Sequence, residues 1–209
     1  MAETEHIKRT KQFANGIKAL WLENFDLSGA DLSGLDLSDA RLRDTDLRGA
    51  NLSGANLSGA DLSGARMSKA DLTNANLDNT FCAHADFDGA NMNKASLRGA
   101  DLHYANLVSA DCTEADFSHA NLALAPCGNA IFVKTNFTGA NLTGSGLAGA
   151  NFTKADFTDA NLTGAYCGQG CFEEAIFQNA KLHDTNFRQA DLTGTGITYN
   201  STEVSRFFD

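Results

Sequence analysis

Five cysteines and five histidines are the residues of this chain best suited to nucleophilic or metal chemistry. A thiolate attacks electrophilic carbon and binds metals, and a neutral imidazole accepts protons or coordinates zinc. Four cysteines recur at one apolar position of a five-residue pattern; they are Cys82, Cys112, Cys127 and Cys167. That position predicts small core residues rather than nucleophiles or disulfide partners. Only Cys171 stands at an outward position of the pattern.

The remaining titratable residues do not suggest a catalytic site. Four histidines fall at outward positions, namely His84, His103, His119 and His183. Aspartates recur mostly at a single position of the pattern, where turn formation explains them without acid–base catalysis. The sequence contains no Gly-rich phosphate loop, metal-binding motif or nucleophile elbow. We therefore expect no enzyme activity, no metal and no cofactor.

The elements that position these residues follow a period of five. Taking the central apolar residue of each unit as position i, the pattern runs from Leu27 to Ile197 without insertion or deletion. Over these 35 units position i is always apolar, Ala fills position i−2 in 26, and Asp or Asn fills position i−1 in 23. Neither a helix nor a straight strand keeps such residues on one side, so the chain must turn once per unit. Positions i−2 and i then face inward, and the other three face outward.

The repeated A(D/N)LSG unit, as in residues 30–34, resembles the pentapeptide-repeat family over residues 25–199. The resemblance implies an all-β solenoid, a right-handed quadrilateral β-helix of about nine coils with 20 residues per coil. Positions 20 apart then stack, which predicts one interior column of Phe117, Phe137, Phe157 and Phe177 and another of Phe132, Phe152 and Phe172. His103 and His183 share an outward column but lie about 19 Å apart, too far to hold one metal.

A solenoid needs caps at both ends, because its terminal coils expose unpaired backbone groups. Residues 1–24 carry Ile7, Phe13, Ile17 and Trp21 at nearly helical spacing, which predicts an N-terminal capping helix. Residues 200–209 form either a C-terminal cap or a contact between two copies of the chain. The apolar residues available for that contact are Val204, Phe207 and Phe208.

The charge of the chain restricts its partners. The formal net charge is −10, and residues 25–125 carry 15 acids against 7 bases. Such acidity disfavours nucleic acids and anionic membranes and favours a protein with a basic surface. The sequence has no apolar run of membrane-spanning length and its first residues lack a signal-peptide pattern, so we expect a cytoplasmic protein.

Two functions are consistent with this reading. The first is a non-enzymatic scaffold that binds another protein. The alternative follows from the resemblance, because family members that confer quinolone resistance resemble duplex DNA and bind DNA gyrase, a topoisomerase. A rod of about 42 Å would match DNA carrying about 25 negative charges. The net charge of −10 and the uninterrupted repeat favour the scaffold.

Apolar residues at outward positions are the candidate protein contacts, because the repeat itself does not require them. One set comprises Tyr104, Val108, Leu124, Pro126, Ile131 and Val133, and a second comprises Tyr166, Cys171 and Ile176 in three successive units. We expect Tyr104 and Leu124 to stack one coil apart, beside an acidic stretch of Asp101, Asp111, Glu114 and Asp116. The alternative is that these are ordinary scattered surface residues.

Overall fold

Every pentapeptide contains the same tight turn. The N–H three residues after position i donates to the carbonyl of residue i, as from Ala30 to Leu27 at 3.0 Å. The residue at i+2 has a positive φ in 35 consecutive turns, from Asn24 to Gly194. This hydrogen bond and this φ are the marks of a type II turn, which favours Gly or Asn at its third position. Glycine fills 13 of these positions, so 22 side chains project from left-handed backbone.

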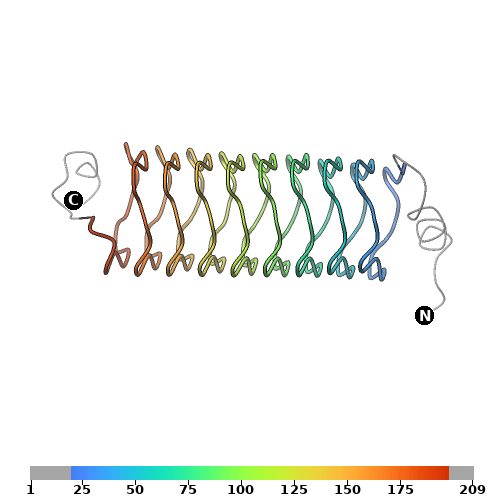
Figure 1. Cartoon of the computed structure of the whole chain (residues 1–209), viewed down its shortest axis with the longest axis horizontal. Helices are drawn as coiled ribbons and strands as arrows, with labels where there is room; N and C mark the ends of the chain where they lie inside the picture. Colours follow the sequence, from blue (N-terminus) through green and yellow to red (C-terminus); the bar gives the residue numbers. More distant parts are fainter. Residues whose placement is uncertain (1–19, 198–209) are drawn as a thin grey trace.

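Hydrogen bonds then join residues that are 20 apart. The computed structural model describes residues 20–197, and its parallel bridges run from Trp21–Arg41 to Cys171–Asp191. Each residue i from Leu22 to Phe172 also donates to the next coil, as from Leu27 N to Asp46 O at 2.8 Å. Within residues 20–197 the repeats contain isolated bridges in place of helices or extended strands. The coils therefore stack along one axis into a rod (Figure 1).

Four turns per coil produce four faces, which we number in chain order. Face 1 holds residues 21–25 and every segment 20 residues later, and faces 2, 3 and 4 start in the same way at residues 26–30, 31–35 and 36–40. Neighbours on one face therefore differ by 20 in number. Residues in successive pentapeptides point from different faces, so neighbours in the sequence do not share a surface.

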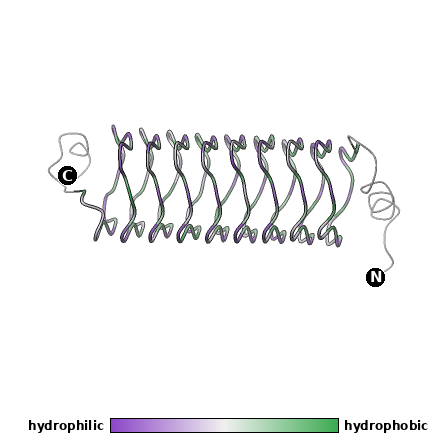
Figure 2. Ribbon diagram, in the orientation of Figure 1, coloured by the Kyte–Doolittle hydropathy of each residue, from purple (hydrophilic) through white to green (hydrophobic). Residues whose placement is uncertain are grey.

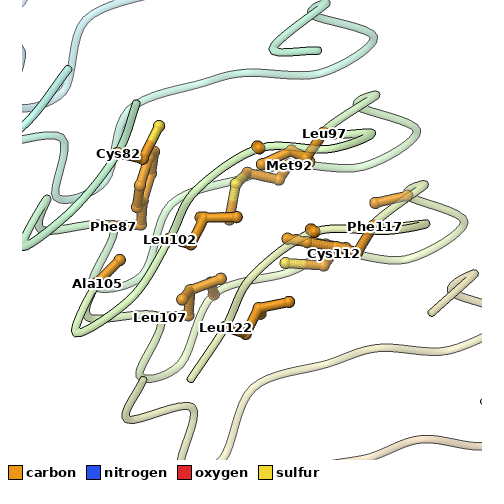
Figure 3. Packing of buried hydrophobic residues seen from close by; sticks show 14 of the residues in the cluster. Cys82, Phe87, Met92, Leu97, Leu102, Ala105, Leu107, Cys112, Phe117 and Leu122 are labelled. Atoms are coloured by element: carbon orange, nitrogen blue, oxygen red, sulfur yellow. The ribbon is translucent and has the colours of Figure 1, made fainter. Parts of the chain in front are cut away.

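Positions i and i−2 fill the interior of the rod. Hydrophobic and hydrophilic residues alternate along each coil (Figure 2), and the apolar side chains lie within it, among them Leu102, Leu107 and Cys112 (Figure 3). The predicted phenylalanine columns are confirmed. Phe137 and Phe157 stack with centroids 5.0 Å apart, and Phe152 and Phe172 stack at 4.7 Å.

The solenoid starts earlier than predicted. Trp21 forms a bridge with Arg41, and Leu20 and Leu22 on either side of it are buried. The assignment of Trp21 to a capping helix is therefore wrong, because Leu22 already stands in register with Leu27. The predicted helix also included residues 22–24, which belong to the first coil, and residues 1–19, which lie outside the described residues. Val204, Phe207 and Phe208 of the predicted C-terminal contact also lie outside the described residues.

Candidate protein-binding surface

The recurrent aspartates and asparagines stabilise the turns. The Asp26 carboxylate accepts from the Ser28 amide at 3.0 Å and from the Ser28 hydroxyl at 2.7 Å. These bonds, led by the hydroxyl, lower the pKa of Asp26. Across coils, Asn121 Nδ2 donates to Asp101 Oδ1 at 2.9 Å. The position-specific acids are thus explained by local hydrogen bonding.

The cysteines and histidines have structural surroundings. Burial raises the pKa of the Cys82 and Cys127 thiols to about 12, so neither is a thiolate at neutral pH. Cys171 is half-buried, with its Sγ 3.4 Å from Thr153 Oγ1. His103 Nδ1 lies 2.9 Å from Asp101 Oδ1. Among residues 20–197, no cluster of three or more His, Cys, Asp or Glu is placed to hold a metal.

The acidic charge is concentrated on two of the four faces. In the described residues, face 3 carries seven acids against three bases, and face 4 carries six against one. Faces 1 and 2 together carry nine acids and seven bases. Faces 1 and 2 are therefore nearly neutral overall. On face 3 part of the charge is paired, since Glu114 lies 3.8 Å from Lys94 and 3.7 Å from Lys134.

Three side chains in successive coils form a ridge where face 1 turns into face 2. They are His84, Tyr104 and Leu124, all at position i+2, and we call them the corner ridge. The Tyr104 ring stacks on that of His84 with centroids 5.2 Å apart. Leu124 bends toward the next coil, where its Cδ2 lies 2.8 Å from the place a Cβ on Gly144 would take. Tyr104 is 50% exposed and Leu124 47%.

The corner ridge has acidic flanks. Asp101 lies on face 1, and Asp86 and Asp88 lie on face 2. The segments that make up this region contain no lysine or arginine; they are residues 81–90, 101–110 and 121–130. Val108 on face 2 is half-buried and Pro126 is exposed, so Pro126 extends the apolar surface around the corner.

The predicted acidic neighbours of this ridge were mostly wrong. Asp111 and Glu114 lie on face 3, and Asp116 lies on face 4. Closeness in sequence does not place residues on one face, because the chain turns once every five residues. Of the four predicted acids only Asp101 shares a face with Tyr104.

The second candidate set does not form one surface either. Tyr166, Cys171 and Ile176 lie on faces 2, 3 and 4 respectively, so the three side chains do not share a face. Tyr166 is 50% exposed, and its ring atoms Cζ and Oη lie 3.2 Å from the place a Cβ on Gly168 would take. The ring thus covers a glycine of its own coil.

Ile131 and Val133 are separated from the corner ridge. Both lie on face 3, where Ile131 is exposed and Val133 is half-buried. Two turns of the chain stand between face 1 and face 3. These residues therefore cannot extend the surface formed by Tyr104 and Leu124.

Two exposed aromatic residues on face 1 were not predicted as contacts. Phe81 is 56% exposed and Trp21 66%, and the Arg41 guanidinium lies 4.2 Å from the centre of the Trp21 ring. The available signal for Phe81 was its position, since i−1 is normally Asp or Asn. With Tyr104 and Leu124, face 1 holds four of the seven large apolar side chains that the described residues expose.

A hollow lies at the N-terminal end of the corner ridge. It measures about 310 Å³ and is lined by Arg43, Asp44, Ser63, Gly64, Ala83 and His84. Gly64 stands between Asp44 and His84 in the same i+2 column, so the absence of a side chain there opens the hollow. Asp44 Oδ1 leans into this space, 2.5 Å from the place a Cβ on Gly64 would take.

Comparisons with known proteins agree with this geometry. The family model of pentapeptide repeats matches residues 26–64, 65–103, 95–126, 125–159 and 155–194. This chain belongs to the pentapeptide-repeat family. It accordingly has the right-handed quadrilateral β-helix of that family. No curated protein sequence matches the chain significantly.

Solved pentapeptide-repeat structures are similar over most of the chain. HetL, involved in heterocyst differentiation regulation in the cyanobacterium Nostoc sp. strain PCC 7120, is 29% identical. That comparison covers 93% of this chain and 94% of HetL, with a TM-score of 0.54. Full-length QnrB1, a plasmid-mediated fluoroquinolone resistance protein, is 20% identical with a TM-score of 0.42 and covers 90% of each chain. Residues 20–197 contain no helix of the length and hydropathy needed to cross a membrane.

Proposed function

We propose that this pentapeptide-repeat protein is a non-enzymatic, cytoplasmic scaffold that binds a protein with a basic surface. The observation that carries the proposal is the corner ridge, an exposed apolar step flanked by Asp86, Asp88 and Asp101 with no lysine or arginine in its segments. Apolar anchors supply the affinity of a protein interface, and charge of one sign at the rim steers the partner. Both features are present at this corner of the rod.

The backbone at the ridge supports a role beyond folding. Tyr104 and Leu124 both have a φ of 58°, in the left-handed region. A residue with a Cβ in that region costs about 1–2 kcal/mol relative to ordinary backbone, a cost that glycine avoids. Glycine occupies the same position in 13 other turns of this chain. The turn therefore does not require the large apolar side chains that this position carries in two adjacent coils, and binding provides a reason for them.

Similarity to HetL supports the same class of function. HetL is described as involved in the regulation of heterocyst differentiation. A scaffold that recognises another protein is a suitable device for regulation, and we extend that class of role to this chain. The similarity does not identify a partner for this rod.

The test is the capture of partner proteins by the immobilised full chain from a lysate of the source organism. Wild type is compared with Tyr104→Gly/Leu124→Gly and with the matched control Ile131→Asn/Ile176→Asn. The control removes two exposed apolar side chains from faces 3 and 4 and replaces them with the residue common at that position. We expect the ridge variant to lose a protein that wild type and control both retain. Equal recovery by all three proteins would contradict the proposal.

A DNA-mimicking gyrase modulator is the second candidate, favoured by the net charge of −9 on faces 3 and 4. Faces 1 and 2 weaken it, because duplex DNA presents phosphates all around its axis. A gyrase supercoiling assay with increasing amounts of the protein, with and without a quinolone, separates the two functions. Inhibition or protection at micromolar protein would establish the gyrase role. The absence of both effects would exclude it.

Association of two copies through the C-terminal end stays a prediction. The residues concerned, Val204, Phe207 and Phe208, lie outside the described part of the chain. Light scattering of the full chain and of a Phe207→Ser/Phe208→Ser variant tests the dimer contact. Halving of the measured mass in the variant would establish the dimer, and a monomer mass for both proteins would contradict it.

A further inference from the structure

We infer that the corner ridge and the adjoining hollow form one docking site for an α-helix of the partner, lying along the rod axis. The helix carries a lysine or arginine two turns before a pair of apolar residues. This inference rests on the proposed protein-binding function and adds the secondary structure and side-chain pattern of the partner. It follows from the spacing of the coils, the unpaired Asp44 carboxylate and the acidic flanks.

The spacing of the coils fits a helix better than an extended strand. Successive coils of a β-solenoid are about 4.8 Å apart, and an α-helix rises about 5.4 Å per turn. A helix along the axis therefore places one side chain near each coil and drifts by only about 0.6 Å per coil. Same-side residues of a strand lie about 6.6 Å apart, so a strand is already about 2 Å out of register at the first coil.

The hollow provides a position for a basic side chain. Asp44 leans into the space above Gly64, and its carboxylate has no hydrogen bond or ion pair within residues 20–197. The Arg43 guanidinium on the same wall lies 3.7 Å from Asp61 and is partly neutralised by it. A lysine or arginine of the partner can therefore pair with Asp44 without displacing an existing ion pair.

The distance from the hollow to the ridge sets the pattern on the helix. Gly64 and Tyr104 are two coils apart, or about 10 Å along the axis. Residues seven apart on a helix are separated by about 10.5 Å, so a basic residue at Gly64 places the seventh residue after it on Tyr104. The residue four further on reaches Leu124, whose side chain bends over Gly144 and forms the end of the apolar surface.

The electrostatic surroundings favour basic residues on the part of the helix that lies over Tyr104 and Leu124. Asp101 flanks the ridge on face 1, and Asp86 and Asp88 flank it on face 2. Asp101 is hydrogen-bonded to His103 and Asn121, which keeps its carboxylate fixed beside Tyr104. Basic residues beside the two apolar residues of the partner would face these carboxylates. Beside the hollow they would instead meet Arg66 and Lys69 on face 2, where Arg66 is the bridge partner of Asp86.

The probe is a synthetic alanine-rich helical peptide with a lysine followed by leucines seven and eleven positions later. One comparison peptide has the same composition but leucines nine and thirteen positions after the lysine. A second replaces the lysine with glutamate, and a third contains two central prolines that prevent a helix. Binding of each labelled peptide to the full chain is measured by fluorescence anisotropy.

We expect the matched peptide to bind at least tenfold more tightly than each comparison peptide. Asp44→Asn should weaken the matched peptide several-fold and leave unchanged the binding of a version with alanine in place of lysine. Asparagine suits the left-handed backbone at this position, where φ is 55°, so the fold is retained. Tyr104→Gly/Leu124→Gly should remove binding of both peptides, with circular dichroism showing that the variant is folded.

Equal binding of the matched peptide and any comparison peptide would overturn the inference, as would an unchanged affinity for Asp44→Asn. This failure is separable from failure of the proposed function. If the ridge variant loses a captured natural partner while the helical probes fail to discriminate, the site binds protein but not a helix of this pattern. If the ridge variant retains both the captured natural partner and the matched peptide, both proposals are wrong.

Discussion

The Tyr104 ring stacks almost parallel on the His84 ring of the preceding coil, with centroids 5.2 Å apart and planes inclined by 3°. Both residues have a φ of 58°. Stacking of this kind contributes about 0.5–1.5 kcal/mol, which is similar to the cost of the left-handed backbone at Tyr104. The two effects nearly cancel, so the stability of the rod should be insensitive to the side chains on which its binding depends.

Replacing both ridge residues by glycine tests this balance. We expect Tyr104→Gly/Leu124→Gly to change the free energy of unfolding by no more than about 1 kcal/mol, because relief of backbone strain offsets the lost contacts. Urea denaturation followed by circular dichroism measures the change. A loss of several kcal/mol would show that the ridge supports the fold, and it would weaken the case for binding.

Removing one ring from the interior column should be far more costly. Phe157 is fully buried and stacks between Phe137 and Phe177, with centroids 5.0 Å away on each side. Phe157→Ala leaves a cavity and should cost about 3–5 kcal/mol. Thermal and urea unfolding measure the cost, with the exposed Ile176→Asn as control. A midpoint equal to that of the control would mean that the column collapses around the gap.

Pro126 interrupts the hydrogen bonding between coils. It has no N–H, so the described residues contain no bridge between Asn106 and residue 126 and no donor to the Ala105 carbonyl. Pro126→Asn restores the donor and should stabilise the rod by about 1 kcal/mol. Ile176→Asn is the matched control, because its N–H already donates to Ala155 at 2.9 Å. An equal gain in the free energy of unfolding for both variants would mean that the asparagine side chain, and not the restored N–H, stabilises the rod.

Asp46 should make part of the stability depend on pH. Its carboxylate lies 2.6 Å from Arg48 and 2.9 Å from Arg66, and the hydrogen bond from Arg48 lowers the pKa of Asp46. Because the folded pKa is below the unfolded value, this stabilisation is present above about pH 4 and is lost as the pH falls through the folded pKa. At pH 7, Asp46→Asn should cost about 1.5–3 kcal/mol.

Urea titrations at pH 7 and at lower pH values measure this dependence. The difference between wild type and Asp46→Asn should narrow as the solution becomes more acidic. Asp44→Asn serves as the control, because Asp44 has no ion pair within the described residues. A difference that stays constant with pH would mean that the ion pairs of Asp46 do not stabilise the fold.

The interior of the rod could be predicted from the sequence because one physical requirement sets it. An apolar residue every five positions is buried each time only if the chain turns once per unit, and the resemblance to the family implied four units per coil. Phe137 and Phe157 stack as that 20-residue register requires. The positive φ at Tyr104 was not predicted, because the periodic pattern does not distinguish types of turn. The backbone dihedral angles of the folded chain show this positive φ.

The surface was harder to predict because sequence distance and spatial distance differ so strongly. Asp111 is seven residues from Tyr104 but lies on face 3, whereas Asp86 is eighteen residues away and flanks the same corner. Phe81 was not predicted because its neighbours on face 1, such as Asp101, are 20 residues away in the sequence. Trp21 was assigned to a helix because it continues the helical spacing of the apolar residues before it. The unit centred on Leu22, which begins the first coil, lacks the Ala and the Asp or Asn of the repeat.

The 20-residue register gives insertions and deletions an unusual effect. A gain or loss of one complete unit of five residues leaves the interior pattern intact, so the fold can survive it. Every residue downstream, however, would move to the adjacent face, and Leu124 would leave the column of Tyr104 if the change fell between them. A change of 20 residues would lengthen or shorten the rod and keep each face as it was. Lineages that rely on one surface should therefore tolerate length changes in steps of 20, whereas lineages that need only a rod can drift in steps of five.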